Sequence, residues 1–340
     1  MFYFSTYFDK NYLTSALVLI DSLEKHCKDF TLFILCLDDF TYRYFNKNNN
    51  TNNNIQLISL RDIECYDVEL KGCKNNRSLV EYYFTLSPCL PLYILNKFNI
   101  EHICSLDADI KFYSNPEELF NNLNEFSIIV TPHKFSFPNK EKIIYGKNNV
   151  SFQIFKNNTV GRNCLEDWRK KCIEWCYDEL DDVNSRFADQ KYLDTWINEY
   201  PGEVKELYDS VSGLAPWNTD NYKIEYKNNL YYSDNLKIIY FHFQRFKILS
   251  NRIAFNAFKE YNIMNQKQLA AIYLDYWKSL KKISEEINYS HNLSQKLRGE
   301  LNVRNLIINN SCFLYCSKNY IINLSKAPMI LRRIIYKLYA

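Results

Sequence analysis

The sequence predicts an α/β protein: a mixed, mostly parallel sheet flanked by helices, followed by a helical C-terminal extension. Three observations indicate this class. Strand-like and helix-like segments alternate over the first hundred residues. The run 31–36 is apolar throughout, which is typical of a strand covered on both faces. The chain has 340 residues, 47% of them hydrophobic, enough for one large domain and an extension.

The alternation begins with a strand at 2–6, a helix at 12–24 and the strand at 31–36. A strand at 55–58, a helical segment at 77–95 and a strand at 103–106 complete a β-α-β-α-β pattern, which produces a parallel sheet. Pro88 and Pro91 are expected to break or kink the helical segment. The further expected strands span 126–130, 150–155 and 238–243. The further expected helices span 164–177, 187–198 and 266–287.

A boundary is expected near residue 250, between a domain of residues 1–250 and an extension of residues 251–340. After Glu300 the chain has no acidic residue, but it has six basic ones: Arg304, Lys318, Lys326, Arg332, Arg333 and Lys337. The stretch 329–339 places apolar and basic clusters at helical spacing. This pattern is typical of a helix lying on anionic lipid, and equally of an amphipathic helix packed on the domain.

Bulk properties exclude several classes of function. The net charge of +3 is too small to indicate a nucleic-acid partner. No apolar run reaches the length of a membrane span, and no N-terminal signal pattern is seen. Eleven cysteines without a secretory signal favour reduced thiols in the cytoplasm.

Two carboxylates stand one residue apart, at Asp107 and Asp109, where the strand at 103–106 ends. Residues i and i+2 of extended backbone point to the same side, so both can bind one hard cation. Mg²⁺ or Mn²⁺ suits oxygen ligands and usually holds substrate phosphates as well. The alternative is a solvated acidic loop. Thr6, Tyr7 and Asp38 also close expected strands, and ligands of parallel sheets bind beyond such ends.

The order of the motifs resembles the GT-A-fold glycosyltransferases, closest to glycosyltransferase family 8 and related bacterial surface-glycan enzymes. The resemblance covers about residues 2–247 and makes residues 1–250 a GT-A catalytic domain. It is carried by four motifs: the pair Asp107 and Asp109, the sequence Asn149-Val150-Ser151, the pair Asp189-Gln190, and the stretch from His242 to Lys247.

The resemblance implies that Asp107, Asp109 and His242 bind Mn²⁺ or Mg²⁺ on the donor diphosphate. It places Asp189 and Gln190 beside the transferred sugar as catalytic residues. Gln190 would stabilise positive charge at the anomeric carbon, and Asp189 would orient an acceptor hydroxyl.

Further donor contacts are implied for Arg77, Asn149, Arg245 and Lys247, and strand-end position adds Thr6, Tyr7 and Asp38. The sequence departs from the family's His-Phe-x-Gly-x-x-Lys pattern. It lacks the glycine, and Lys247 comes one residue early, so Arg245 is an alternative diphosphate ligand.

Ordinary structural roles compete with these assignments. His242 can be a satisfied core group, and Asp189 can cap its helix. Arg77 can form a surface ion pair with Glu81. Trp217 can belong to the core, or, if exposed, form a sugar-stacking platform.

Taken as a whole, the resemblance implies a metal-dependent glycosyltransferase that retains the anomeric configuration. The expected donor is a UDP-sugar. The expected acceptor is a glycan, a lipid-linked molecule or a protein in bacterial surface polysaccharide or glycoconjugate synthesis. The enzyme is expected in the cytoplasm or on the inner face of the membrane. Two alternatives remain: a sugar-phosphate nucleotidyltransferase, and a non-catalytic carbohydrate-binding or assembly protein.

Overall fold

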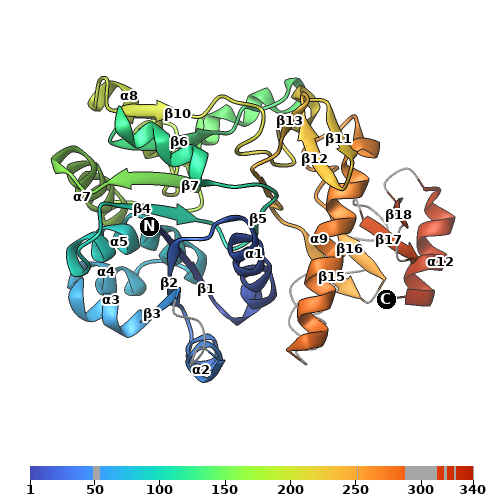
Figure 1. The fold of residues 1–340 in the computed structure, drawn as a ribbon, viewed down its shortest axis with the longest axis horizontal. Coiled ribbons are helices and arrows are strands. Elements are labelled where there is room, and N and C mark those ends of the chain that lie inside the picture. Colours follow the sequence, from blue (N-terminus) through green and yellow to red (C-terminus); the bar gives the residue numbers. More distant parts are fainter. Residues whose placement is uncertain (49–53, 251, 288–311, 318–319, 325–326, 340) are drawn as a thin grey trace.

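A computed structural model describes residues 1–48, 54–250, 252–287, 312–317, 320–324 and 327–339. A large α/β unit occupies one side of the molecule, and α9, α12 and a small sheet occupy the other (Figure 1). Arg304, Lys318 and Lys326 of the expected basic tail lie outside the described residues. Within the described part, no helix is both long and apolar enough to cross a membrane.

The central sheet has seven strands in the order β10-β6-β7-β4-β1-β2-β3. Their bounds are β1 (Phe2–Phe8), β2 (Phe30–Cys36), β3 (Ile55–Ser59), β4 (His102–Leu106), β6 (Ile128–Pro132), β7 (Asn148–Lys156) and β10 (Val204–Glu206). Strand β1 pairs in parallel with β2 and β4, and β2 pairs in parallel with β3. Strand β7 is antiparallel to both of its neighbours, β4 and β6. The prediction of a mixed, mostly parallel sheet is therefore confirmed.

Helices cover both faces of this sheet (Figure 1). The α-helices described are α1 (Leu13–His26), α2 (Asp39–Asn48), α3 (Leu60–Tyr66), α4 (Val68–Gly72), α5 (Leu79–Lys97), α6 (Glu117–Phe120), α7 (Thr159–Glu174), α8 (Trp196–Glu199), α9 (Gln266–Glu286) and α12 (Met329–Tyr339). The 3₁₀ turns described are η1 (Lys10–Tyr12), η2 (Cys73–Asn75), η3 (Asn121–Asn124), η4 (Phe137–Tyr145), η5 (Lys191–Thr195) and η6 (Thr219–Asn221).

The apolar strand β2 explains why two cores form. Successive side chains of a strand point to opposite faces. Phe33 and Leu35 accordingly enter the core beneath α5 and α7. Leu32 and Ile34 enter the core that α1 completes.

Helix α5 departs from the expected break at its prolines. It runs without interruption, although Pro88 and Pro91 both lie inside it and are buried. Its start is fixed by a capping box in which Ser78 and Glu81 bond each other's backbone N–H. A helical proline removes one backbone hydrogen bond, and the packing of α5 against β4 and α7 compensates for this loss.

The segment 187–198 is not the single helix that was expected. Strand β9 (Arg186–Phe187), the 3₁₀ turn η5 and the short helix α8 replace it. Asp194 in this segment accepts the backbone N–H groups of Lys147 and Asn148, at 2.8 and 3.1 Å. This tertiary contact ties the segment to the start of β7, so tertiary structure overrides the local helical pattern.

Three small sheets complete the large unit and its border. Strand β5 (Ile110–Phe112) pairs antiparallel with β14 (Tyr240–His242), and β8 (Leu180–Asp181) pairs antiparallel with β9. The third sheet consists of β11 (Ile224–Lys227), β12 (Leu230–Ser233) and β13 (Leu236–Lys237).

The C-terminal part contains a sheet as well as helices, so the expectation of a helical extension is corrected. Strands β15 (Lys247–Ser250), β16 (Ile253–Phe255), β17 (Cys312–Ser317) and β18 (Tyr320–Asn323) form an antiparallel sheet. The hairpin of β15 and β16 crosses residue 250. Lys111 of β5 donates to Asp275 of α9 at 2.6 Å, which holds this part beside the edge where β4 ends.

Candidate functional site

Asp107 and Asp109 lie directly after β4, in the short connection to β5. His242 ends β14, which pairs with β5 so that His242 stands opposite Ile110. The backbone N–H of Phe243 also donates to the carbonyl of Asp109, at 3.0 Å. This pairing brings His242 to the two aspartates across 133 positions of sequence, as counted from Asp109 (242 − 109).

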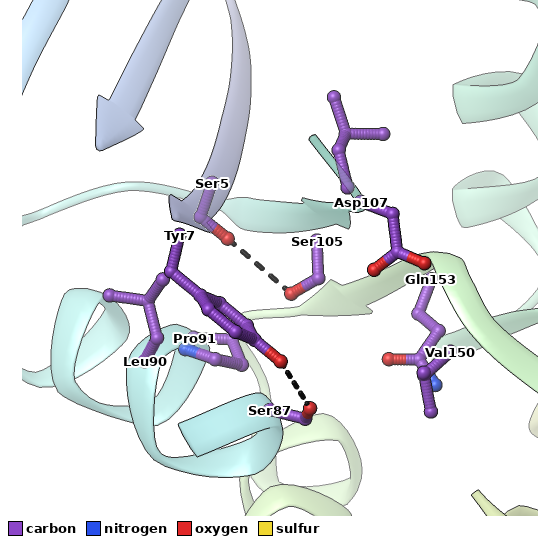
Figure 2. A pocket seen from close by; sticks show the side chains of 10 residues that line it. Ser5, Tyr7, Ser87, Leu90, Pro91, Ser105, Asp107, Val150 and Gln153 are labelled. Atoms are coloured by element: carbon purple, nitrogen blue, oxygen red, sulfur yellow. Dashed lines mark hydrogen bonds between the residues drawn. The ribbon is translucent and has the colours of Figure 1, made fainter. Parts of the chain in front are cut away.

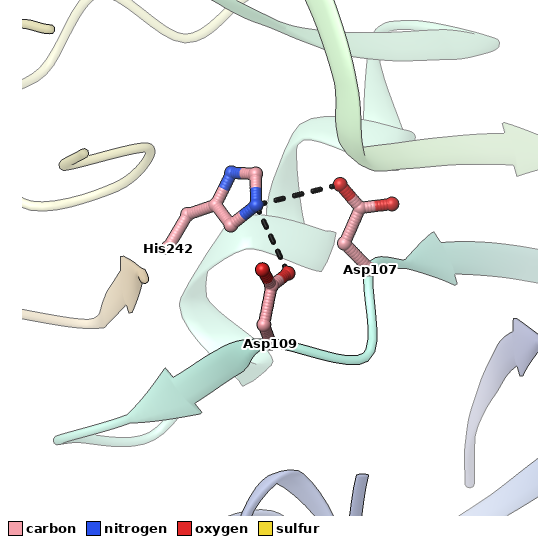
Figure 3. Close-up of side chains that lie close together, drawn as sticks. All are labelled: Asp107, Asp109 and His242. Atoms are coloured by element: carbon pink, nitrogen blue, oxygen red, sulfur yellow. Dashed lines mark ion pairs between the residues drawn. The ribbon is translucent and has the colours of Figure 1, made fainter. Parts of the chain in front are cut away.

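The three side chains converge on one point (Figure 3). His242 Nε2 lies 3.0 Å from an oxygen of Asp109 and 3.5 Å from an oxygen of Asp107. One donor atom from each residue lies within 4.8 Å of the others, and this is the one such group of three found in the described part of the chain. The spacing suits a shared divalent cation.

The electrostatics of the cluster fit a cation. Burial raises the pKa of Asp107 above its usual range, although His242 acts in the opposite direction. Burial opposes a charged imidazole, but the carboxylates of Asp109 and Asp107 outweigh it and raise the pKa of His242. Nε2 of the buried His242 faces both carboxylates at contact distance, although neither ring nitrogen meets strict hydrogen-bond geometry among the described residues. Two carboxylates and an imidazole form a donor set suited to Mn²⁺ and, through oxygen, to Mg²⁺.

Trp217 supports His242 from behind. The two rings meet edge to face with their centroids 5.5 Å apart, and Trp217 also packs against His133 and Tyr261. Only 4% of Trp217 is exposed. Trp217 is therefore a core residue that orients the imidazole, and not a sugar-stacking platform.

Asp189 lies in the interior, within electrostatic reach of Asp107. It is 2% exposed, and its carboxylate accepts the hydroxyl of Ser87 at 2.5 Å. The hydroxyls of Ser87 and Tyr7 lie 2.9 Å apart (Figure 2). Ser87 therefore links Asp189 to Tyr7 of β1. Burial raises the pKa of Asp189 to about 7, while the bond from Ser87 acts in the opposite direction.

Gln190 follows Asp189 but occupies a more open position. Its side-chain amide donates to the carbonyl oxygen of Tyr145 at 2.9 Å. The contact joins the start of η5 to the end of η4, next to Gly146. Asp189 and Gln190 are thus separated into an interior carboxyl and a partly exposed amide.

No protein-family model matches the chain. Two uncharacterized proteins of Bacillus subtilis (strain 168) are similar to it in sequence. YfnD is 28% identical over 292 residues, covering 84% of this chain and 91% of YfnD. YfnF is 28% identical over 256 residues, covering 73% of this chain and 82% of YfnF.

Among solved structures, the galactosyltransferase LgtC in complex with donor and acceptor sugar analogues is similar in fold. The TM-score is 0.51 at 12% identity, over 88% of this chain and 100% of LgtC. The chain has the GT-A fold. An active-site mutant of LgtC superposes equally, with a TM-score of 0.50 at 14% identity.

Asp38 lies just after β2, as expected, whereas Thr6 lies inside β1, which continues to Phe8. The carboxylate of Asp38 accepts the backbone N–H of Lys10 at 2.9 Å and that of Thr41 at 2.7 Å. Asp38 thereby joins the turn after β1 to the start of α2. The hydroxyl of Thr6 is buried and has no hydrogen-bond partner among the described residues.

Arg77 and Asn149 are both engaged in holding the framework. Arg77 donates to Thr85 and to the carbonyl of Ile173, each at 2.6 Å, and its expected partner Glu81 caps α5 instead. Asn149 donates to the carbonyl of Thr131 at 3.0 Å and accepts from Ser151. Their proposed donor contacts stay predictions.

Arg245 occupies the position of the missing glycine with a left-handed backbone, at φ 61°. Its guanidinium pairs with Glu260 at 2.8 Å and is close enough to Tyr12 to influence the pKa of that phenol. Lys247 begins β15, where its backbone pairs with Phe255. Arg245 thus adopts a backbone conformation that glycine usually takes, and the donor contacts of Arg245 and Lys247 stay predictions.

Sequence reasoning missed two residues near the cluster, Ser87 and Gln153. Both interrupt apolar runs, Ser87 between Leu86 and Pro88 and Gln153 between Phe152 and Ile154. Ser87 is 7% and Gln153 1% exposed. A polar residue inside an apolar run was the signal that could have identified them, because a buried polar group needs an internal hydrogen-bond partner.

Proposed function

We propose that this protein is a metal-dependent glycosyltransferase that uses a nucleoside-diphosphate sugar, with UDP-sugar as the expected donor. The cluster of Asp107, Asp109 and His242 carries the proposal, because it stands at the carboxyl edge of a GT-A sheet. LgtC, which has the same fold, is a galactosyltransferase and was crystallised with donor and acceptor sugar analogues.

Asp107, Asp109 and His242 would hold Mn²⁺ or Mg²⁺. When bound there, the ion would stabilise negative charge on the departing diphosphate. The protein supplies the fixed geometry: the pairing of β5 with β14 sets the position of His242, and Trp217 limits rotation of its ring. Arg245, whose side chain is more than half exposed, would add a cationic contact to the diphosphate.

The proposed stereochemistry is retention. Gln190 is the partly exposed polar group of the Asp189-Gln190 pair, so it is the better placed of the two to contact the donor sugar. The amide of Gln190 would stabilise positive charge that develops at the anomeric carbon. A buried Asp189 that is bound to Ser87 supports a role in positioning over a role as a base.

The acceptor is proposed to be a glycan, a lipid-linked molecule or a protein in bacterial surface glycan synthesis. The two similar Bacillus subtilis proteins support a bacterial setting. Helix α12 supports work at a membrane surface. Ile330, Ile334 and Leu338 lie one turn apart on it and are exposed, and Ile330 is 72% exposed.

The basic residues of α12 favour anionic lipid over a second copy of the chain. Arg333 and Lys337 are exposed and flank the apolar ridge at helical spacing, while Ile335 anchors the helix to the sheet beneath. Two copies packed through this ridge would bring like charges together. We therefore propose peripheral binding to anionic membrane at the cytoplasmic face.

The test is a thermal-shift and calorimetry screen of UDP- and GDP-sugars, each with Mn²⁺ and with chelator. Metal-dependent binding followed by transfer to an acceptor supports the proposal. Metal-dependent binding without turnover or hydrolysis supports the carbohydrate-binding alternative. Formation of a nucleotide-sugar from a sugar phosphate and a nucleoside triphosphate supports the nucleotidyltransferase.

A further inference from the structure

The 3₁₀ turn η4 presents apolar side chains to solvent. Of its nine residues, only Asn139 is buried. Phe137 is 79% exposed, and Ile143, Ile144 and Tyr145 are exposed as well. Surface segments usually bury apolar side chains and expose polar ones, so the pattern of η4 is reversed. Exposed apolar patches of this kind mark sites of interaction.

Polar contacts hold η4 against the residues that support the metal cluster. The side-chain amide of Asn139 donates to the carbonyl oxygens of Tyr261 and Trp217, at 2.7 and 3.3 Å. The backbone N–H of Ser136, just before η4, donates to the carbonyl oxygen of Trp217 at 3.0 Å. Trp217 in turn packs against His242. The turn is therefore held in place without burying its apolar side chains, which leaves them available to a partner.

The other end of η4 meets Gln190. The side-chain amide of Gln190 donates to the carbonyl oxygen of Tyr145 at 2.9 Å, and the ammonium of Lys191 donates to that of Ile144 at 2.5 Å. The ring of Tyr145 also packs against Phe187, with the centroids 4.8 Å apart. The apolar surface thus ends at the residue proposed to contact the transferred sugar. An acceptor that reaches this sugar therefore has η4 directly beside it.

Basic side chains border this surface. The Nζ atom of Lys140 lies 5.1 Å from the ring centre of Phe137, and Lys142 follows two positions later. Neither lysine forms an ion pair with another described residue. Glu141 offsets one of these charges and Lys191 adds another, so the border is positive overall. The surface therefore suits a ligand that combines an apolar chain with an anionic group.

This chemistry distinguishes the possible occupants. A nucleoside-diphosphate sugar has anionic groups but no apolar chain, and an uncharged glycan has neither. A lipid that carries its sugar on a phosphate or diphosphate has both. A second copy of the chain would bring the lysines of two such surfaces together, which is unfavourable.

We propose that η4 binds the apolar chain of a lipid-phosphate-linked acceptor, with its exposed apolar residues contacting the chain and Lys140 and Lys142 contacting the phosphate. The inference rests on the proposed function and deepens it, because it selects one of the acceptor classes. In this arrangement the lipid chain lies on η4 and the acceptor hydroxyl faces the sugar beside Gln190.

The experiment measures calorimetric Kd values for dodecyl phosphate below its critical micelle concentration. Dodecyl maltoside serves as the neutral amphiphile, and inorganic phosphate as the anion alone. Chelator is present throughout, so that phosphate cannot bind through a metal at the aspartates. All proteins in the calorimetry carry Arg333→Glu and Lys337→Glu, which remove the proposed lipid contacts of α12.

Two double variants remove the two parts of the surface. The apolar variant is Phe137→Ser/Ile144→Ser, and the charge variant is Lys140→Gln/Lys142→Gln. Phe137, Ile144 and Lys140 are exposed, so these changes should leave the core intact. Thermal melts establish that each variant is folded.

The apolar variant should weaken both amphiphiles by about 10- to 100-fold, because each side chain of this size contributes about tenfold when it is covered. The charge variant should weaken dodecyl phosphate by about 3- to 10-fold and dodecyl maltoside by less than about twofold. Inorganic phosphate should bind at least about 100-fold more weakly than dodecyl phosphate. The control variant Val68→Ser/Leu79→Ser, at exposed residues of α4 and α5, should change none of these values.

A kinetic measurement separates an acceptor from membrane lipid. With the donor and the acceptor sugar that the transfer assay identifies, kcat/KM is compared for that sugar on dodecyl phosphate and on methanol, both as monomers. The chain should prefer the dodecyl phosphate form by at least about 10-fold, and the apolar variant should lose this preference.

Two results would overturn the acceptor surface. One is equal affinity of the apolar and control variants for dodecyl phosphate. The other is a loss of this affinity with the acceptor preference unchanged, which would show that η4 contacts membrane lipid or a protein. Failure to bind any nucleotide-sugar would instead overturn the proposed function. The calorimetry uses no nucleotide, so it reports on the surface in either case.

Discussion

Replacing Asp109 with Asn is the most direct perturbation of the candidate metal centre. The change keeps the shape of the side chain, but it removes one of two anionic ligands and the carboxylate oxygen that lies 3.0 Å from His242. It also removes a negative charge from beside Asp107, so the fold itself should be little affected. The expected loss is therefore in metal-dependent binding.

The magnitude follows from ligand count. Changing even an outer-sphere partner of a metal ligand typically costs about 10- to 100-fold in affinity, so losing a direct ligand should cost at least about 100-fold. With Mn²⁺ and nucleotide-sugar at 100 times the Kd, wild type gains about 2.7 kcal/mol of stability. At about 2 °C per kcal/mol, its Tm rises by about 5 °C.

For Asp109→Asn at the same concentrations, a Kd raised 100-fold leaves a gain of only about 0.4 kcal/mol, which is a Tm shift below about 1 °C. The assay is differential scanning fluorimetry with Mn²⁺, with chelator, and with and without nucleotide-sugar. Asp39→Asn, a fully exposed carboxylate after β2, is the matched control and should keep the full shift. A full Mn²⁺-dependent shift in Asp109→Asn would refute the three-ligand assignment.

Three further predictions concern Asp189, α12 and Arg245. Burial raises the pKa of Asp189 to about 7, so the folded state holds a proton that the unfolded state releases between about pH 4 and 7. The free energy of unfolding should therefore fall as pH rises through this window, by up to about 1.4 kcal/mol per pH unit. In urea melts, Asp189→Asn should make the free energy of unfolding less dependent on pH over this window. The double variant Arg333→Glu/Lys337→Glu should lose sedimentation with anionic vesicles, and pelleting equal to wild type would contradict the membrane proposal. Arg245 has a left-handed backbone at φ 61°, so Arg245→Gly should raise the free energy of unfolding by up to about 1 kcal/mol. The same variant should bind the nucleotide-sugar more weakly in calorimetry, and unchanged binding would show that Arg245 does not contact the donor.

The parallel core of the fold was predictable because its signals are local. An apolar run such as 31–36 indicates a strand covered on both faces. In β2, Phe33 and Leu32 indeed pack into separate cores on the two faces of the sheet. The helical segment was predicted correctly, but Pro88 and Pro91 do not break α5. The penalty of a helical proline is local, whereas the packing that compensates for it comes from β4 and α7, which no local pattern encodes.

The residues of the candidate site likewise include some that local sequence predicts and some that it does not. Asp107 and Asp109 could be paired from the period of extended backbone alone. His242 joins them only through the pairing of β14 with β5, so the resemblance to known enzymes, and not spacing, placed it there. Ser87 and Gln153 escaped attention because they meet only at a cavity lined by separate elements, which no local pattern encodes.

The stereochemistry of transfer can be argued from the burial of Asp189. An inverting enzyme needs a base that contacts the acceptor hydroxyl. The carboxyl of Asp189 is 2% exposed and accepts from Ser87, so it is not presented to an acceptor. Gln190 is more open, and a neutral amide cannot serve as such a base.

Retention with Gln190 beside the anomeric carbon is therefore the expected outcome. Gln190→Ala should lower kcat by about 10- to 100-fold with little change in KM, because its contact strengthens in the transition state. Asp189→Asn, which can still accept from Ser87, should keep most of the activity. The anomeric proton coupling of the product, measured by NMR, reports the configuration directly. An inverted product together with an inactive Asp189→Asn would show that Asp189 turns toward the acceptor and acts as the base, which would contradict this assignment of roles.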